Sequence, residues 1–128
     1  MHYVIDTNAI LRFLLSDNLD QQEKTAKLFH DAHAGKCFVT VLPIVCAEVA
    51  YILESHYKQT RKVIAEHLRV LISQTWISVP ERRILLHTIQ HFTNGTHFVD
   101  AFLLSYAKEH QHTLFTFDKK LQKQIAKN

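Results

Sequence analysis

The chain has few of the residues that create hinges, turns or cross-links. Its 128 residues include only two glycines, two prolines and two cysteines. Glycine and proline most often interrupt regular structure, so flexible hinges are scarce, and we find no repeat, linker or low-complexity run. Cys37 and Cys46 form neither a CxxC pair nor a cluster with metal-ligand spacing. Both lie in apolar stretches, which predicts buried, reduced thiols and fits a reducing cytosol.

The sequence also lacks long hydrophobic runs. No uninterrupted apolar stretch approaches the ~18 residues that a membrane-spanning helix needs. The first residues include an acid, Asp6, and have neither the basic start nor the apolar core of a signal peptide. These absences favour a soluble cytoplasmic protein.

The overall composition is ordinary for a globular domain. Hydrophobic residues make up 47% and charged residues 21% of the chain, which predicts a single domain, residues 1–128, around one core. The 15 basic and 12 acidic residues give a net charge of +3. This mild basic excess permits a polyanionic partner without requiring one.

Short apolar runs alternate with helical patterns along the chain. Such alternation predicts an α/β fold with a mostly parallel sheet. Thr7 or Asn8 can cap the helix after the first strand, Pro43 opens a long helix, and Thr60 can cap the next one. The predicted strands are residues 3–5, 37–41, 76–79 and 113–116, and the predicted helices include residues 21–34, 43–58, 81–92, 98–109 and 119–126.

Two acids follow predicted strands. Asp6 follows the first apolar run, which predicts a strand buried on both faces, and Asp118 follows the fourth. A parallel sheet would place the two carboxylates at the same edge, where ligands of such sheets bind. A turn or helix-cap residue is the simpler interpretation of Asp6.

Two further acids lie in apolar helical patterns. Val45 and Tyr51 are helical neighbours of Glu48, and Leu103 and Leu104 are helical neighbours of Asp100. Burying a carboxylate in such surroundings costs several kcal/mol unless a cation or hydrogen-bond donors compensate. No Arg or Lys falls within four residues of Glu48. A cation shared by the four acids explains the pattern better than four separate pairings, and oxygen ligands favour Mg²⁺ or Mn²⁺. Such an ion can generate a hydroxide nucleophile and stabilise charge on a phosphoryl oxygen.

Four motifs in this order resemble those of the PIN domain family, and most closely its VapC-type ribonuclease toxins. The resemblance runs from Tyr3 to Asp118. The motifs are Asp6-Thr7-Asn8, Ala47-Glu48-Val49, Val99-Asp100-Ala101 and Leu114-Phe115-Thr116-Phe117-Asp118.

The resemblance implies a three-layer α/β/α sandwich that cleaves RNA with Mg²⁺ or Mn²⁺. It also implies a homodimer, and inhibition by a cognate antitoxin whose C-terminal segment covers the active site. By motif, the catalytic acids would be Asp6, Glu48, Asp100 and Asp118, the metal ligands Asp6, Asp100 and Asp118, and the supporting polar residues Asn8 and Thr116.

Other interpretations remain open. An RNA-processing nuclease without an antitoxin and a non-catalytic RNA- or protein-binding module would share the same fold. A dehalogenase-like phosphatase would need a second acid where Asn8 stands. His87 and His91 have the spacing of a zinc pair but no third ligand nearby. The basic run of residues 119–127 could contact phosphates, although solvated charge is the commoner meaning of such runs.

Overall fold

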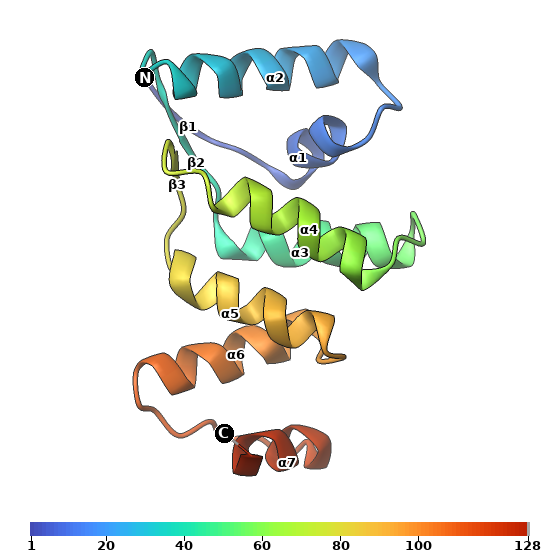
Figure 1. Ribbon diagram of the computed structural model, residues 1–128, viewed down its shortest axis with the longest axis vertical. Coiled ribbons are helices and arrows are strands. Elements are labelled where there is room, and N and C mark those ends of the chain that lie inside the picture. The colour runs from blue at the N-terminus through green and yellow to red at the C-terminus, as the bar shows by residue number, and fades with distance from the viewer. Residues whose placement is uncertain (128) are drawn as a thin grey trace.

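The computed structural model describes residues 1–127 and has an α/β architecture. The described chain contains three parallel β-strands and seven α-helices, coloured in chain order in Figure 1. The strands are β1 (His2–Val4), β2 (Phe38–Thr40) and β3 (Ile77–Ser78); the helices are α1 (Thr7–Leu14), α2 (Leu19–His33), α3 (Pro43–Ser55), α4 (Arg61–Ile72), α5 (Arg82–Thr93), α6 (Phe98–Glu109) and α7 (Lys119–Lys127).

The sheet has the order β1-β2-β3, and every neighbouring pair is parallel. Tyr3 pairs with Val39, which in turn pairs with Ile77. Helix α2 lies on one side of the strands, and α3 and α4 lie on the other (Figure 1). The predicted three-layer α/β/α fold is therefore confirmed.

One hydrophobic core joins the sheet to the helices around it. Parallel strands are normally covered on both faces, so β2 and β3 contribute fully buried side chains. The largest fully buried side chains are Phe92, Ile10, Leu53, Ile64, Leu68, Ile72, Ile77, Leu85, Ile89, Val39, Val41 and Val49. Cys37 and Cys46 are buried free thiols, as predicted, and burial raises the pKa of Cys46 to about 12.

Most helix boundaries agree with the local sequence signals. Pro43 occupies the first turn of α3, and the Thr60 hydroxyl accepts a hydrogen bond from the Val63 amide at 3.3 Å at the start of α4. The expected cap of α1 was wrong. Asp6 fills that position instead of Thr7 or Asn8, and its Oδ1 accepts the Ala9 amide at 2.9 Å.

The first strand is more exposed than its sequence predicts. Tyr3 is 39% exposed and Val4 is 69% exposed, while only Ile5, just after the strand, is buried. The expectation of a strand covered on both faces was wrong because β1 lies at the edge of the sheet. The edge of β1 that faces away from β2 pairs with no strand within residues 1–127.

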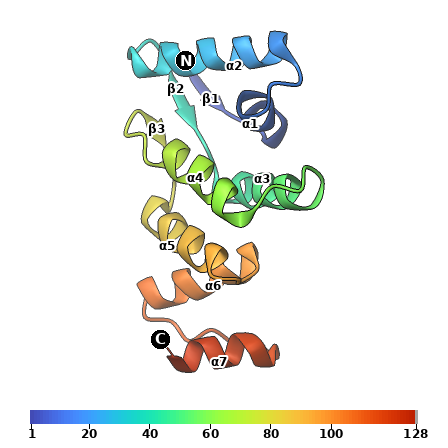
Figure 2. The same ribbon diagram turned by 45° about the vertical axis from the view of Figure 1, so that its right-hand side comes forward.

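The predicted fourth strand is absent from the described chain. Residues 113–116 have no regular structure, and Phe115 and Phe117 are 82% and 85% exposed. A strand requires a neighbouring backbone for its hydrogen bonds. This segment follows α6 at the opposite end of the molecule from β1, with α3 to α6 lying between them (Figures 1 and 2).

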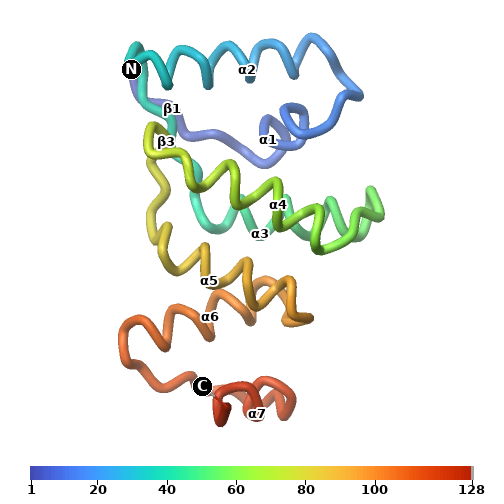
Figure 3. Tube along the Cα trace, viewed as in Figure 1, coloured from blue at the N-terminus to red at the C-terminus, as the bar shows by residue number. Residues whose placement is uncertain are grey.

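The second half of the chain extends the molecule away from the sheet. Helix α5 packs on α4 and α6 packs on α5, and α7 lies at the far end of this stack (Figure 3). Within residues 1–127, no helix combines the length and apolarity that crossing a bilayer requires.

Candidate functional site

Asp6 and Asp118 occupy equivalent local positions. Each residue comes directly before a helix, and Oδ1 of each accepts a backbone hydrogen bond at 2.9 Å, from Ala9 and Leu121 respectively. Acidic caps of this kind satisfy free amides and complement the helix dipole. Both residues are therefore helix caps, which for Asp6 is the simpler of the two interpretations, and in the described chain Oδ2 of each carboxylate has no hydrogen bond.

Asp100 and Asp118 line one cavity. Asp100 is half-buried in the first turn of α6, and the cavity, about 200 Å³ in volume, also contacts Arg61, His97 and Lys120. Carboxylates and cationic side chains therefore face the same small space. Such a lining can hold both a cation and an anionic group.

Glu48 lies on α3 beside a neighbouring cavity of about 320 Å³, which shares Arg61 and His97 with the cavity of Asp100. The sequence predicted a buried carboxylate, but Glu48 is exposed. Its apolar neighbours Ile44 and Tyr51 are also exposed, by 76% and 63%. The burial prediction was wrong because this face of α3 borders the open cavity between α3 and the start of α6.

Asp6 is separated from the other three acids. It lines a different cavity, together with Tyr3, Val4 and Lys24. Asn8 is exposed on α1, two residues further along. The structure thus brings Asp100 and Asp118 together, places Glu48 next to them, and leaves Asp6 and Asn8 elsewhere.

Thr116 supports the backbone of Asp118 rather than its carboxylate. Its hydroxyl accepts the Asp118 amide at 3.1 Å, and its carbonyl accepts the Gln122 side-chain amide at 2.8 Å. These bonds hold the turn that presents Asp118 at the start of α7.

Arg61 connects the elements that carry these acids. Its Nε donates to Glu54 Oε2 on α3 at 2.7 Å, and one terminal nitrogen donates to the carbonyls of Phe92 and Thr96 at 2.9 and 3.0 Å. The guanidinium also lies 4.4 Å from the centre of the Phe92 ring. Gln124 on α7 donates to the Thr96 hydroxyl at 2.6 Å. Sequence reasoning missed this network because its members are far apart in the chain.

The arrangement does not form a metal centre. Within the part of the chain that the structure describes, no three His, Cys, Asp or Glu side chains come close enough to hold an ion. The expected ligands are divided, with Asp6 in one cavity and Asp100 and Asp118 in another. A divalent cation held by all three does not fit this conformation, and the possible zinc pair of His87 and His91 gains no third ligand among residues 1–127.

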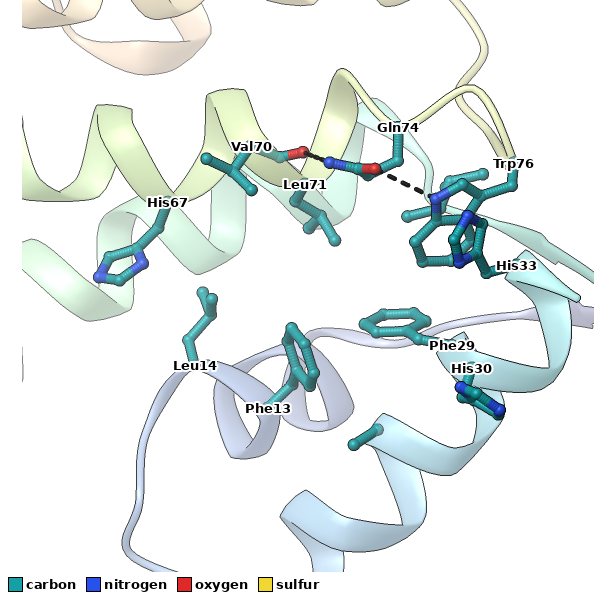
Figure 4. A pocket seen from close by; sticks show the side chains of 12 residues that line it. Phe13, Leu14, Phe29, His30, His33, His67, Val70, Leu71, Gln74 and Trp76 are labelled. Atoms are coloured by element: carbon teal, nitrogen blue, oxygen red, sulfur yellow. Dashed lines mark hydrogen bonds between the residues drawn. The ribbon is translucent and has the colours of Figure 1, made fainter.

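A further cavity, about 500 Å³ in volume, lies between α1, α2 and α4 and has no acidic lining. Figure 4 shows aromatic and aliphatic side chains facing this space, with histidines around it. Gln74 fixes one wall, since its Nε2 donates to the Val70 carbonyl at 2.9 Å and its Oε1 accepts from Trp76 Nε1 at 3.1 Å. This cavity is apolar and distinct from the acidic site.

The family model of the PIN domain matches residues 3–128. The chain therefore belongs to the PIN domain family, whose fold is a nuclease fold and whose members generally require divalent metals. Searches of curated proteins and of solved structures each gave no significant match.

Proposed function

We propose that this PIN domain, a single domain over residues 1–128, is a metal-dependent endoribonuclease and the toxin of a toxin–antitoxin pair. The cavity shared by Asp100 and Asp118 carries the proposal. Carboxylates suit a divalent cation, and Arg61 and Lys120 in the same lining suit a phosphate group. The RNA substrate and a cytoplasmic place of action follow from the proposed activity.

The proposed cofactor is Mg²⁺ or Mn²⁺, with Asp6, Asp100 and Asp118 as ligands. Glu48 completes the catalytic acids, and Asn8 and Thr116 support them. Hard oxygen ligands are typical of these ions. Because Asp6 lies apart in this structure, binding requires a rearrangement that brings it to the other acids.

The proposed protein partners are an antitoxin and a second copy of the chain. Exposed apolar side chains flank two of the acids, namely Ile44 and Tyr51 near Glu48 and Val99 and Leu103 near Asp100. Contiguous exposed apolar residues often mark protein interfaces. A protein bound to this face would cover Glu48 and Asp100, which is how an antitoxin would block cleavage.

The separation of Asp6 favours one alternative function. If the conformation described here is the working one, the domain binds RNA or protein without cutting it. An RNA-processing nuclease without an antitoxin would share the site of the proposed toxin and differ in its partner.

The test is cleavage of a mixed RNA pool in Mg²⁺, Mn²⁺ or EDTA by folded, partner-free protein. Asp6→Asn and Asp100→Asn should each lower the rate by at least ~100-fold, since each removes a charge that stabilises the reaction. Asp20→Asn is the matched control because Asp20 pairs with Lys24 on the exposed face of α2, away from the acids of the site. Metal-dependent cleavage that both site variants lose would support the nuclease. Folded wild type that neither cuts RNA nor binds metal would overturn it.

A further inference from the structure

Arg61 lies at a helix position that does not favour a cation. It is the first residue of α4, and the dipole of a helix favours acidic rather than basic side chains in its first turn. The side chain is half-buried and lines both cavities that contain acids, the one beside Glu48 and the one shared by Asp100 and Asp118. The contacts that account for this arginine therefore lie outside α4.

The guanidinium of Arg61 binds the C-terminal end of α5. One terminal nitrogen donates to the carbonyls of Phe92 and Thr96. Carbonyls at the end of a helix carry partial negative charge, which a cation from another helix can neutralise. Nε donates to Glu54, and the second terminal nitrogen lies 3.5 Å from the same carboxylate. Most of the N–H groups of Arg61 are therefore already used by protein acceptors.

Thr96 transmits this contact to Asp100 and Asp118. It is buried and directly precedes His97, the N-cap residue of α6, whose first turn contains Asp100. The Thr96 hydroxyl accepts the side-chain amide of Gln124 from α7, the helix that Asp118 caps. A displacement of Thr96 would therefore move both acids.

Glu54 connects the same guanidinium to Glu48. Both glutamates are on α3, six residues apart, and a helix is regular over that rise of about 9 Å. The ion pair between Arg61 and Glu54 thus fixes α3 against the turn between α5 and α6. Because the pair is partly exposed, it contributes more to geometry than to stability.

We propose that Arg61 is a positioning residue that holds Glu48, Asp100 and Asp118 in a fixed arrangement. It acts through its ion pair with α3 and through its bonds to the turn before α6, and it makes no contact with the reacting atoms. The consequence for RNA cleavage rests on the proposed function, whereas the placement of the three acids does not.

Steady-state RNA cleavage by Arg61→Met tests the proposal, because methionine keeps much of the side-chain length and removes every donor. Misplaced catalytic groups lower kcat, and we expect a loss on the order of 10- to 100-fold. KM should change little, because the side chain does not bind the substrate. A raised KM with unchanged kcat would overturn the proposal and assign Arg61 to direct RNA binding.

Arg61→Lys separates geometry from charge. Lysine keeps a positive charge that attracts phosphate but lacks the planar fork that bonds a carboxylate and two carbonyls together. We expect this variant to lose kcat as Arg61→Met does. A lysine variant with the wild-type kcat would contradict the proposal, because the charge alone would then be sufficient.

Two further variants control for stability and for contacts between α4 and α5. Ile89→Val shortens a buried side chain of α5 and lowers stability without removing a hydrogen bond of Arg61. Arg69→Met removes another arginine of α4, which donates to Gln90 on α5 at 3.4 Å. Both variants should keep the wild-type kcat. Losses of kcat as large as that of Arg61→Met would show a general effect of weakened packing and overturn the proposal.

Hydrogen exchange of single amides gives a readout without activity. The amides of Ala101 and Leu121 are bonded in the first turns of α6 and α7. In Arg61→Met both should exchange at least ~10-fold faster than in Ile89→Val, because the turn before α6 has lost its anchor. Equal exchange in the two variants would overturn the proposal. If exchange accelerates but no protein, wild type included, cuts RNA, the positioning role stands and the proposed nuclease function fails.

Discussion

The two ends of the molecule contain the same local pattern in two different settings. At one end β1 leads to Asp6 and α1, and at the other residues 113–117 lead to Asp118 and α7. Both acids cap their helices with the same geometry. The first segment pairs with β2 and its helix packs into the core, whereas the second pairs with nothing in the described chain. Local sequence therefore determines the cap, and the available partner determines whether a strand forms before it.

The largest effect should come from shortening a buried side chain on the helix at each end, α1 and α7. Ile10 on α1 is fully buried, and Leu121 is the only buried residue of α7 within the described chain. Ile10→Ala should lower the free energy of unfolding by about 2–5 kcal/mol. Leu121→Ala should release α7 and leave the main unfolding transition unchanged. Urea denaturation, with hydrogen exchange of the α7 amides, checks both. Equal losses in the two variants would contradict the difference between the ends.

The next largest effect should come from the contacts that join the second half of the chain to the core. Arg61→Met should lower the free energy of unfolding by about 2 kcal/mol, because the carbonyls of Phe92 and Thr96 lose a charged donor. Glu54→Gln keeps that donor in place and should cost less, since the Arg61–Glu54 pair is partly exposed. Thermal unfolding of both variants measures the difference. A larger loss of stability in Glu54→Gln would show that the Arg61–Glu54 ion pair, rather than the bonds from Arg61 to the carbonyls, holds these elements together.

Removal of the two helix caps, Asp6 and Asp118, should change the free energy of unfolding by less than the substitutions at Arg61. Asp6→Ala should cost about 1 kcal/mol, and Asp6→Asn almost nothing, because asparagine caps as well as aspartate. Asp118→Ala should destabilise α7 alone. Circular dichroism during denaturation follows each variant. Because Asp6→Asn preserves the cap, a loss of RNA cleavage in that variant reports on chemistry rather than folding, and a large loss of stability there would remove that distinction.

The smallest effect concerns pH at the interface between α5 and α6. Burial lowers the pKa of His91, with added contributions from Lys108 and His87. The unfolded chain then binds more protons than the folded one as pH falls through the ordinary histidine value of about 6.5, so stability decreases in that range. His91→Gln should flatten this part of the pH profile, measured by urea midpoints. If the slope of stability against pH is unchanged in His91→Gln, other groups cause the pH dependence.

The sequence was sufficient for much of the fold. Alternating apolar runs predicted the α/β class, and α6 begins and ends at the predicted residues, Phe98 and Glu109. Thr60 and Pro43 start their helices as local rules predict. Each of these signals acts within a few residues, so no knowledge of the tertiary structure was needed.

The site was harder to predict because it depends on contacts between distant segments. Glu48 lies among apolar neighbours in sequence but is exposed, since that face of α3 borders an open cavity. Arg61 contacts groups more than 30 residues away, at Phe92 and Thr96. The grouping of Asp6 with the other three acids stays a prediction.

The most direct test asks whether the acids at the two ends of the molecule act in one site. Metal-dependent RNA cleavage is measured for folded Asp6→Asn protein, Asp118→Asn protein and the double variant. A single site predicts that the double variant cleaves no more slowly than the slower single variant, because the effects of residues that act as a unit are not additive. Losses in rate that multiply in the double variant would contradict a single site.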